Sequence, residues 1–429
     1  MERIELARCL GFDGRGGAIH HTVIEERLPE RFMQAFRCAV AVGGTVFVAD
    51  PSWGAVERAR LAEVVGQSPA TRGQRSIDNL RSEVEDRESE TGQGWLCLPT
   101  GGSSGVVRWA RHDQDTLAAA VRGFCGHFEV GQVNAVGVLP LHHVSGLMAW
   151  MRCAFTGGRY IPWAWADMEA GRWPQPGAGD WFLSLVPTQL QRLLGRPEAV
   201  DRLRRFRAVF IGGGPAWPDL LDRAADAGLP LAPGYGMTET AAMVAALKPR
   251  EFLLGRRGCG SALPHAVLTL NQDGVIQIAA GSLFHGYFPG WREEPGPWST
   301  EDLGRVDEKG ELQVIGRRDA VIISGGKKIE PAEVEAVLRS TGQFVDVAVL
   351  GVPDAEWGES VVAAYPDDTN APDLALVERF LAGGIASYKR PKHYVAVGWP
   401  RNAQGKINRK ALKVLVAAKI GGPGGRQGV

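Results

Sequence analysis

The chain has 429 residues, of which 45% are hydrophobic and 22% charged, a composition typical of a globular protein long enough for two domains. Its 48 basic and 48 acidic residues cancel, which disfavours a nucleic-acid or membrane-surface partner, so any anion site must be local. The charged start and the lack of a long apolar run predict neither a signal peptide nor a membrane span. We therefore expect a cytoplasmic protein.

Strand-like and helix-like segments alternate through the first three quarters of the chain, and this alternation predicts an α/β fold with largely parallel sheets. The polar residues 66–94 are expected to form loop and surface helix. We expect strands at 45–49, 95–98, 133–139, 181–186 and 208–211, and helices at 32–42, 117–128, 189–194 and 218–227.

The pattern changes near residue 316 to that of a small α+β domain. Pro331, followed by Glu333 and Glu335, is a typical helix start. We expect strands at 311–315, 321–323, 346–350 and 361–365, helices at 331–339 and 374–381, and a frayed Gly-rich tail from 421.

The cysteines are widely spaced, without a CxxC pair. This spacing argues against a zinc site or a redox dithiol and favours reduced thiols, which we expect to be small buried hydrophobic residues. They are Cys9, Cys38, Cys97, Cys125, Cys153 and Cys259.

A Gly/Ser-rich segment follows the strand expected at 95–98. Its glycines can turn backbone N–H groups inward, and its hydroxyls and an arginine add donors, so it favours phosphate binding. A flexible surface loop is the alternative. The chain has no GxxxxGK[ST] motif and no GxGxxG opening a βαβ unit, which excludes a Walker A site and leaves a dinucleotide fold unsupported. The candidate phosphate ligands are Thr100, Gly101, Gly102, Ser103, Ser104, Gly105 and Arg108.

Four further motifs follow in order: GYGMTE at 234–239, STEDLG at 299–304, GRRD at 316–319 and PRNAQGKI at 400–407. Each is weak alone, but their shared order and spacing resemble the adenylate-forming superfamily of acyl-CoA synthetases, luciferases and carrier-protein adenylation domains. The resemblance runs from about residue 98 to about residue 412. It implies an acyl-CoA synthetase-like fold: a large multi-layered N-terminal α/β domain at 1–318 and a small mobile α+β C-terminal lid domain at 319–429.

The resemblance implies a nucleotide site. The Gly/Ser segment would hold the β- and γ-phosphates of ATP, with Arg108 where the family usually has lysine, a planar fork in place of a point charge. Glu239 would carry Mg²⁺, because a carboxylate that attacks a phosphate needs cations to neutralise the charge. The remaining expected ATP/AMP contacts are Tyr235 at adenine, the neighbouring Gly236, Thr238 at the α-phosphate, and Asp302 with Arg317 at the ribose.

The resemblance also implies a lid that moves between two half-reactions. Asp319 matches the hinge position, although the second aspartate that often follows it is Ala320 here. Lys406 matches the catalytic lysine of adenylation. After rotation of the lid, Gly325 and Gly326 would let the pantetheine chain of coenzyme A pass close to the backbone. Lys327 and Lys328 beside them would meet CoA phosphates or form a solvated face.

The resemblance places the segments at 138–147, 186–190 and 212–215 at the acyl pocket, and their sequences are similar to those of the ortho-succinylbenzoate–CoA ligases of menaquinone and phylloquinone synthesis. His143 and Ser145 would supply polar contacts in an apolar pocket, or His143 would act as a gate or packing residue. His142 and His143 are not expected to be a metal pair, because adjacent side chains do not easily share an ion and no third ligand is close in sequence. The candidate pocket residues are His143, Ser145, Gly146, Gln189, Gly212, Gly213, Gly214 and Met237.

The sequence thus predicts an ATP-dependent acid–CoA ligase that acts through an acyl-adenylate, with Mg²⁺ as cofactor and a small carboxylic acid, ATP and CoA as partners. A benzoate, coumarate or fatty acid ligase and a stand-alone enzyme that loads a carrier protein are alternatives. The lack of a carrier domain after residue 412 favours free CoA. A non-catalytic nucleotide-binding relative is a third alternative, against which Glu239, Asp302, Arg317 and Lys406 argue. A homo-oligomer is left open.

Overall fold

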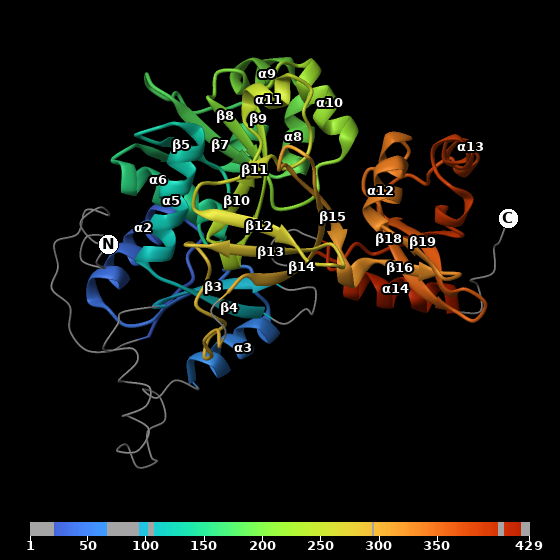
Figure 1. The fold of residues 1–429 in the computed structure, drawn as a ribbon, viewed down its shortest axis with the longest axis horizontal. Helices are drawn as coiled ribbons and strands as arrows, with labels where there is room; N and C mark the ends of the chain where they lie inside the picture. Colours follow the sequence, from blue (N-terminus) through green and yellow to red (C-terminus); the bar gives the residue numbers. More distant parts are fainter. Residues whose placement is uncertain (1–20, 67–93, 102–106, 294–295, 402–406, 422–429) are drawn as a thin grey trace, which may run out of the picture.

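The computed structural model describes residues 21–66, 94–101, 107–293, 296–401 and 407–421. The blue to yellow segments form one large body of sheets and helices, and the orange to red segments form a smaller body beside it (Figure 1). The large α/β part and the small α+β part expected from the sequence are confirmed. None of the described helices is both long and apolar enough to cross a membrane.

The first sheet has four strands in the order β1-β2-β3-β4, parallel except for β4. The β3–β4 register pairs Thr100 with Arg108, so two of the expected phosphate ligands lie side by side across the ladder. The elements are β1 (Thr22–Ile24), β2 (Val46–Val48), β3 (Leu96–Gly101) and β4 (Val107–His112), with α2 (Pro29–Val42) and α3 (Ala55–Gly66) beside them.

The second sheet has seven strands in the order β11-β10-β9-β8-β7-β5-β6. Its strands from β6 to β9 are parallel, and the central β5 and β8 are buried throughout, as expected for strands covered on both faces. The strands are β5 (Asn134–Gly137), β6 (Tyr160–Pro162), β7 (Trp181–Leu185), β8 (Ala208–Ile211), β9 (Leu231–Met237), β10 (Ala242–Ala246) and β11 (Ser261–Ala262).

Helices cover both faces of the seven-stranded sheet. On one face, Phe182 and Phe210 pack with Phe124 of α5. On the other face, their sequence neighbours Leu183 and Val209 pack against α8 to α10. This alternation follows from the two-residue period of a strand. The helices are α5 (Gln114–Phe128), α6 (Val144–Thr156), α7 (Trp165–Glu169), α8 (Pro187–Leu194), α9 (Pro197–Leu203), α10 (Pro218–Asp226) and α11 (Pro249–Leu253).

A third, antiparallel sheet joins the large part to the small one. Ile276, Ile278 and Leu312 of this sheet pack against Tyr235 and Val244 of β9 and β10. Of its strands only the last was expected from the sequence. They are β12 (Ala266–Leu270), β13 (Val275–Ala280), β14 (Trp298–Val306) and β15 (Leu312–Arg317).

The C-terminal part has its own sheet and two cores. Helices α12 and α13 pack on one face around Val334 and Leu381, and α14 packs on the other through Leu412 and Val416. The elements are β16 (Ile322–Ser324), β17 (Lys327–Ile329), α12 (Pro331–Ser340), β18 (Ala348–Asp354), β19 (Gly358–Pro366), α13 (Leu374–Gly384), β20 (His393–Val397) and α14 (Arg409–Gly421).

Two sequence-based expectations need correction. Residues 324–328 do not form a loop throughout, because only Gly325 and Gly326 make the two-residue turn of the β16–β17 hairpin, with φ values of +55° and +73°, while the other three residues lie in its strands. Helix α5 begins earlier than expected because the Asp113 side chain accepts hydrogen bonds from the backbone N–H groups of Asp115 and Thr116. Most of residues 66–94, expected as loop and surface helix, lie outside the described residues.

The cysteines are only partly as expected. Cys97 and Cys153 are buried, whereas Cys38, Cys125 and Cys259 are half-buried. Cys9 lies outside the described residues.

Candidate active site

A large pocket of about 2940 Å³ opens at the carboxyl ends of β5, β7, β8 and β9 and extends to the C-terminal part. In open parallel sheets this edge is where ligands bind. The pocket is lined by these expected site residues: Thr100, Arg108, His143, Ser145, Gln189, Gly212, Gly213, Gly214, Tyr235, Gly236, Met237, Thr238, Glu239, Asp302, Arg317 and Asp319.

The other expected residues fall into three groups. Gly146, Gly325 and Gly326 are described and are not among the lining residues. Gly101 ends β3. Gly102, Ser103, Ser104, Gly105 and Lys406 lie outside the described part of the chain.

Glu239 is buried at the inner wall of the pocket, and two hydroxyl groups hold its carboxylate. The Tyr287 hydroxyl donates to Glu239 Oε1 at 2.7 Å, and the Thr100 hydroxyl donates to the same oxygen at 3.2 Å. Burial and the neighbouring Glu239 raise the pKa of Tyr287, so this donor keeps its proton. The Arg108 guanidinium lies 4.0 Å from the centre of the Tyr287 ring. These contacts fix the carboxylate in a geometry suited to an oxygen-seeking cation such as Mg²⁺.

The turn that carries Glu239 is tightly built. Ala241 and Ala242, which follow it, have positive φ values of 49° and 76°, uncommon for residues other than glycine. A Cβ atom on Gly236 would lie 1.8 Å from the carbonyl oxygen of Ala242, so the close approach of β9 and β10 requires glycine there. Such backbone strain is typical of functional sites, where the surrounding structure maintains it.

The imidazole ring of His112 holds the same turn through its backbone. Its Nε2 lies 2.8 Å from the Thr238 carbonyl oxygen, which can only accept, so Nε2 carries the hydrogen. Its Nδ1 lies 3.1 Å from the Thr116 hydroxyl. Burial lowers the pKa of His112 to about 4, so the ring is neutral at physiological pH. The backbone that presents Thr238 and Glu239 is thus held by an uncharged donor.

Tyr235 and Asp302, two of the expected nucleotide contacts, meet at one side of the pocket. The Tyr235 hydroxyl donates to Asp302 Oδ2 at 2.7 Å, and Asp302 Oδ1 lies 3.6 Å from an Arg317 nitrogen. Arg317 also pairs with Asp319, with Nε 2.9 Å from Oδ1. Burial raises the pKa of Asp302, while Tyr235 and Arg317 oppose that change. The structure therefore brings the expected adenine, ribose and hinge residues into one connected group.

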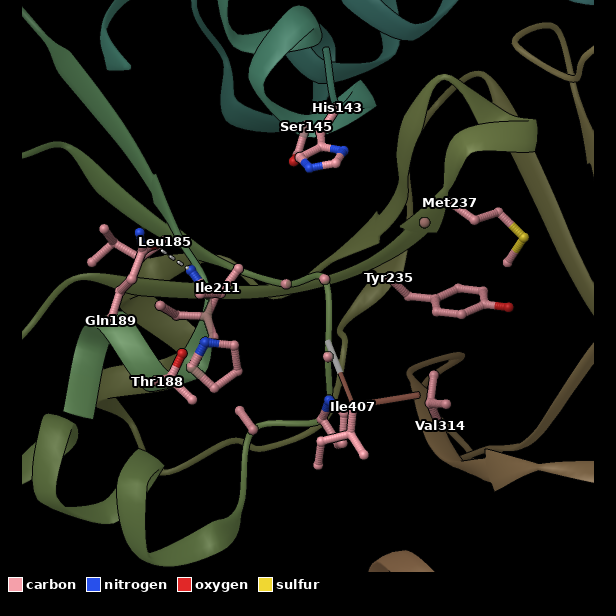
Figure 2. A pocket seen from close by; sticks show the side chains of 18 of the residues that line it. His143, Ser145, Leu185, Thr188, Gln189, Ile211, Tyr235, Met237, Val314 and Ile407 are labelled. Carbon is pink, nitrogen blue, oxygen red and sulfur yellow. Dashed lines mark hydrogen bonds between the residues drawn. The ribbon is translucent and has the colours of Figure 1, made fainter. Parts of the chain in front are cut away.

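The part of the pocket that is expected to hold the acid has polar groups on two walls. Figure 2 shows His143 and Ser145 pointing into the pocket from the start of α6, whereas Thr188 and Gln189 approach from another wall. The Gln189 side chain accepts a hydrogen bond from the Val186 N–H at 3.0 Å, so its amide oxygen already caps α8.

Gly146 was expected in the pocket, but it serves packing. A Cβ atom there would lie 2.1 Å from the Pro140 carbonyl oxygen. The first turn of α6 lies so close to the preceding loop that only glycine fits.

Arg152 is a cation buried at the inner end of the pocket. The residue is 5% exposed, and its guanidinium lies 4.2 Å from the centre of the Phe124 ring and 5.9 Å from that of Phe210. Burial lowers its pKa to about 10, so it stays charged at neutral pH. Among the described residues no carboxylate pairs with it, and its buried Nε has no acceptor. An uncompensated buried cation is costly, and an anionic ligand would offset that cost.

The lid residues are placed only in part. Ile407, the residue after Lys406, lines the pocket beside Val314 (Figure 2). Its backbone forms a bridge with Arg401 at the other end of the PRNAQGKI motif. Ile322 of β16 lines the pocket, whereas Gly325 and Gly326 at the turn of the same hairpin are not among the lining residues. The Lys327 Nζ lies 4.3 Å from the centre of the Tyr388 ring.

Several residues of the site were not found from the sequence. Tyr287 and His112 act through hydroxyl and imidazole groups that belong to no motif, so no sequence signal pointed to them. Arg152 had a signal, because it is a lone charge inside the apolar run of residues 147–155. Asp50 lies close to His142 and His143, so the argument that they lack a third ligand does not hold in space.

Comparison with known proteins agrees with this geometry. The AMP-binding enzyme family matches residues 33–288, more than half of the chain, and the AMP-binding enzyme C-terminal domain matches residues 333–406. The chain therefore belongs to the AMP-binding enzyme family.

The sequence is also similar to that of individual proteins. A 2-succinylbenzoate–CoA ligase of Geobacillus kaustophilus is 34% identical over 300 residues, which are 66% of this chain and 61% of that protein. The matched region thus spans about three fifths of the relative's length.

Solved structures share the fold. The o-succinylbenzoate CoA synthetase MenE of Bacillus subtilis, in complex with the acyl-adenylate intermediate OSB-AMP, superposes with a TM-score of 0.76 at 24% identity and covers 96% of this chain and 92% of its own. The same enzyme in complex with ATP and magnesium ion gives 0.73 at 23% identity, over 95% and 92%.

Proposed function

We propose that this protein is an ATP-dependent acid–CoA ligase that works through an acyl-adenylate. The observation that carries the proposal is the convergence of Thr100, Glu239 and the Tyr235–Asp302 pair on one pocket. Together they offer a hydroxyl group that can donate a hydrogen bond to a phosphate, a carboxylate that can bind a cation, and an aromatic ring with a carboxylate that can bind a nucleoside. Membership of the AMP-binding enzyme family supports the same assignment.

The proposed reaction has two steps. A carboxylate oxygen of the acid attacks the α-phosphorus of ATP, forming an O–P bond while pyrophosphate leaves. The CoA thiol then gives up its proton, and its sulfur attacks the acyl carbon, forming a C–S bond while AMP leaves. Bound Mg²⁺ would neutralise phosphate charge at Glu239, because both reactants of the first step are anions. Thr238, presented by the turn that His112 supports, would contact the α-phosphate.

The acid we propose is 2-succinylbenzoate, the substrate named in the relatives. It has two carboxylates, of which one would react with ATP and the other would meet a cation. Arg152 is suited to the second role, since it is charged, buried at the pocket's inner end and unpaired among the described carboxylates. This substrate would place the enzyme in menaquinone or phylloquinone biosynthesis.

A mobile lid completes the proposal. We place the boundary between the nucleotide part and the lid at residues 318 and 319, with Asp319 as the hinge. Ile407 lines the pocket, which supports a role for the adjacent Lys406 in adenylation. The hairpin turn at Gly325 and Gly326 would reach the CoA chain only after the lid rotates. The cytoplasmic location stays a prediction of the sequence.

Product analysis tests this function. With 2-succinylbenzoate, ATP, Mg²⁺ and CoA, the purified protein should form one thioester for each AMP and pyrophosphate released. Plain benzoate should react far more slowly. A preference for benzoate would remove the quinone-pathway assignment, and AMP release without a thioester would remove CoA as the acceptor.

A further inference from the structure

Asp50, His142 and His143 come together on one wall of the pocket although Asp50 lies far upstream in the sequence. Asp50 follows β2 of the four-stranded sheet, and the two histidines lie between β5 and α6. One ligand atom from each residue lies within 4.8 Å of the others. The two imidazole rings lie 4.5 Å apart with their planes at 62°, so their nitrogens can approach a common point.

Only one of the two carboxylate oxygens of Asp50 has hydrogen-bond partners in the described structure. Its Oδ1 accepts hydrogen bonds from the Ser52 N–H at 2.8 Å and the Ser52 hydroxyl at 2.7 Å, and lies 3.5 Å from His142 Nε2. Its Oδ2 is buried and has no hydrogen-bond partner in the described structure. Asp50 is 2% exposed, so water does not readily serve this oxygen. A buried carboxylate oxygen without a partner is unfavourable and points to a missing ligand.

A simpler interpretation is that Asp50 only orients the His142 ring. Carboxylates often play this part, and the 3.5 Å contact through Oδ1 fits it. That interpretation explains the contact of Oδ1, but it leaves Oδ2 buried without a hydrogen-bond partner in the described structure. A nitrogen of His143 lies within 4.8 Å of the ligand atoms of Asp50 and His142. A shared cation accounts for all three groups.

The donor set selects the kind of cation. Two imidazole nitrogens and one carboxylate suit Zn²⁺, Co²⁺ or Ni²⁺, whereas Mg²⁺ prefers oxygen ligands.

We propose that Asp50, His142 and His143 bind one first-row transition metal ion of the Zn²⁺ class on the wall of the pocket. Three protein ligands leave a coordination position that faces the pocket, open to water or to an oxygen of a bound small molecule. Rotation of the side chains would bring the ligand atoms to metal distances of about 2.0–2.2 Å. Its donor set differs from that around Glu239, whose carboxylate accepts hydrogen bonds from the hydroxyl groups of Thr100 and Tyr287.

Titration of metal-free full-length protein with Co²⁺ tests the site, because Co²⁺ in a four- or five-coordinate nitrogen–oxygen site absorbs visible light. We expect one Co²⁺ per chain, displaced by Zn²⁺ but not by excess Mg²⁺. Asp50→Asn and His142→Gln should each weaken binding by roughly 10-fold or more. His393→Gln, a histidine of β20 in the C-terminal sheet, is the matched control and should leave binding unchanged.

No saturable Co²⁺ absorption in the wild type, or equal affinity in the folded Asp50→Asn and His142→Gln variants, would overturn the proposal. A second measurement covers variants that do not fold. Zn²⁺ should protect His142 and His143 of the wild type from diethyl pyrocarbonate, read by peptide mass spectrometry, while Mg²⁺ should not. Equal modification with and without Zn²⁺ would also overturn it.

Discussion

The Tyr235 hydroxyl donates a hydrogen bond to Asp302 at 2.7 Å and so joins β9 of the seven-stranded sheet to β14 of the antiparallel sheet. Burial and the nearby Asp302 raise the pKa of Tyr235, so the phenol keeps its proton. One carboxylate oxygen is thereby held in place, and the other faces Arg317. These contacts therefore organise the side of the pocket that we propose binds the nucleotide.

Tyr235→Phe keeps the aromatic ring and removes only this hydrogen bond. A net hydrogen bond contributes about 0.5–1.5 kcal/mol, so we expect KM for ATP to rise roughly 2- to 12-fold. Steady-state kinetics at saturating acid and CoA measures the change. Tyr394→Phe is the matched control, since its hydroxyl donates to Glu378 in the C-terminal part at 2.8 Å. An equal KM in the wild type and Tyr235→Phe would contradict a role for this contact.

Replacement of Arg152 tests the proposed distal carboxylate site. Arg152→Met should lower kcat/KM for 2-succinylbenzoate by roughly 10- to 100-fold, the scale of a hydrogen bond to a charged group. It should change kcat/KM for benzoate little, because benzoate has no second carboxylate. The ratio of the two values, measured on the same preparation, separates substrate binding from loss of folded protein.

Arg159→Met is the control for this ratio. Arg159 also stacks on an aromatic ring, 5.8 Å from the centre of Trp181, but its side chain is exposed. We expect the ratio to stay at the wild-type value in this variant. If Arg152→Met lowers turnover of both acids equally, Arg152 is a packing residue.

Lys406→Ala tests the two-position lid. The lysine is proposed to contact the reacting carboxylate only during adenylation, so pyrophosphate release should fall by roughly 100-fold or more. Thioester formation from a supplied acyl-adenylate should persist. Lys309→Ala, in the turn between β14 and β15, should behave as the wild type in both assays. Equal loss of both half-reactions would rule out a separate role for Lys406 in the first.

The buried His112 predicts a pH effect on stability. Burial lowers its folded-state pKa from 6.5 to about 4, so between these values the unfolded chain binds more protons than the folded protein. The free energy of unfolding should therefore decrease as pH falls from 6.5 toward 4 and be retained above 6.5. The range from about pH 7 to about pH 5 contains the reference pKa of histidine. Across this range, the free energy of unfolding should fall less in His112→Gln than in the wild type.

Urea unfolding at the two pH values measures this difference, and His393→Gln serves as the control substitution. The comparison uses the change with pH, because His112→Gln also loses contacts at pH 7. His265, whose pKa burial also lowers to about 4, keeps part of the pH dependence in every variant. Identical pH dependence in wild type and His112→Gln would contradict the assignment.

Periodicity and motif order predicted much of the fold. The buried strand β8 is a continuous apolar run, and Pro331 marks the start of α12 as expected. The antiparallel sheet was largely missed because its strands are half exposed and partly polar. Strand β14, for example, contains Ser299, Glu301 and Asp302 and resembles a loop in sequence.

Site residues that belong to sequence motifs were predicted, whereas residues that only the topology brings to the pocket were missed. Glu239, Asp302 and Arg317 belong to ordered motifs, and the structure brings them to one pocket. Tyr287 and Asp50 reach the same pocket from distant segments, and no local pattern encodes that approach. Such contacts depend on how the sheets stack, which the sequence alone does not specify.

Acid-dependent release of pyrophosphate without CoA is the most direct test of the central claim, that this pocket joins an acid to AMP. With ATP, Mg²⁺ and 2-succinylbenzoate, the wild type should release pyrophosphate and accumulate an acyl-adenylate detectable by mass spectrometry. Glu239→Gln should lose both signals while remaining folded. Release that does not depend on the acid, or an adenylate formed equally well by Glu239→Gln, would contradict the account.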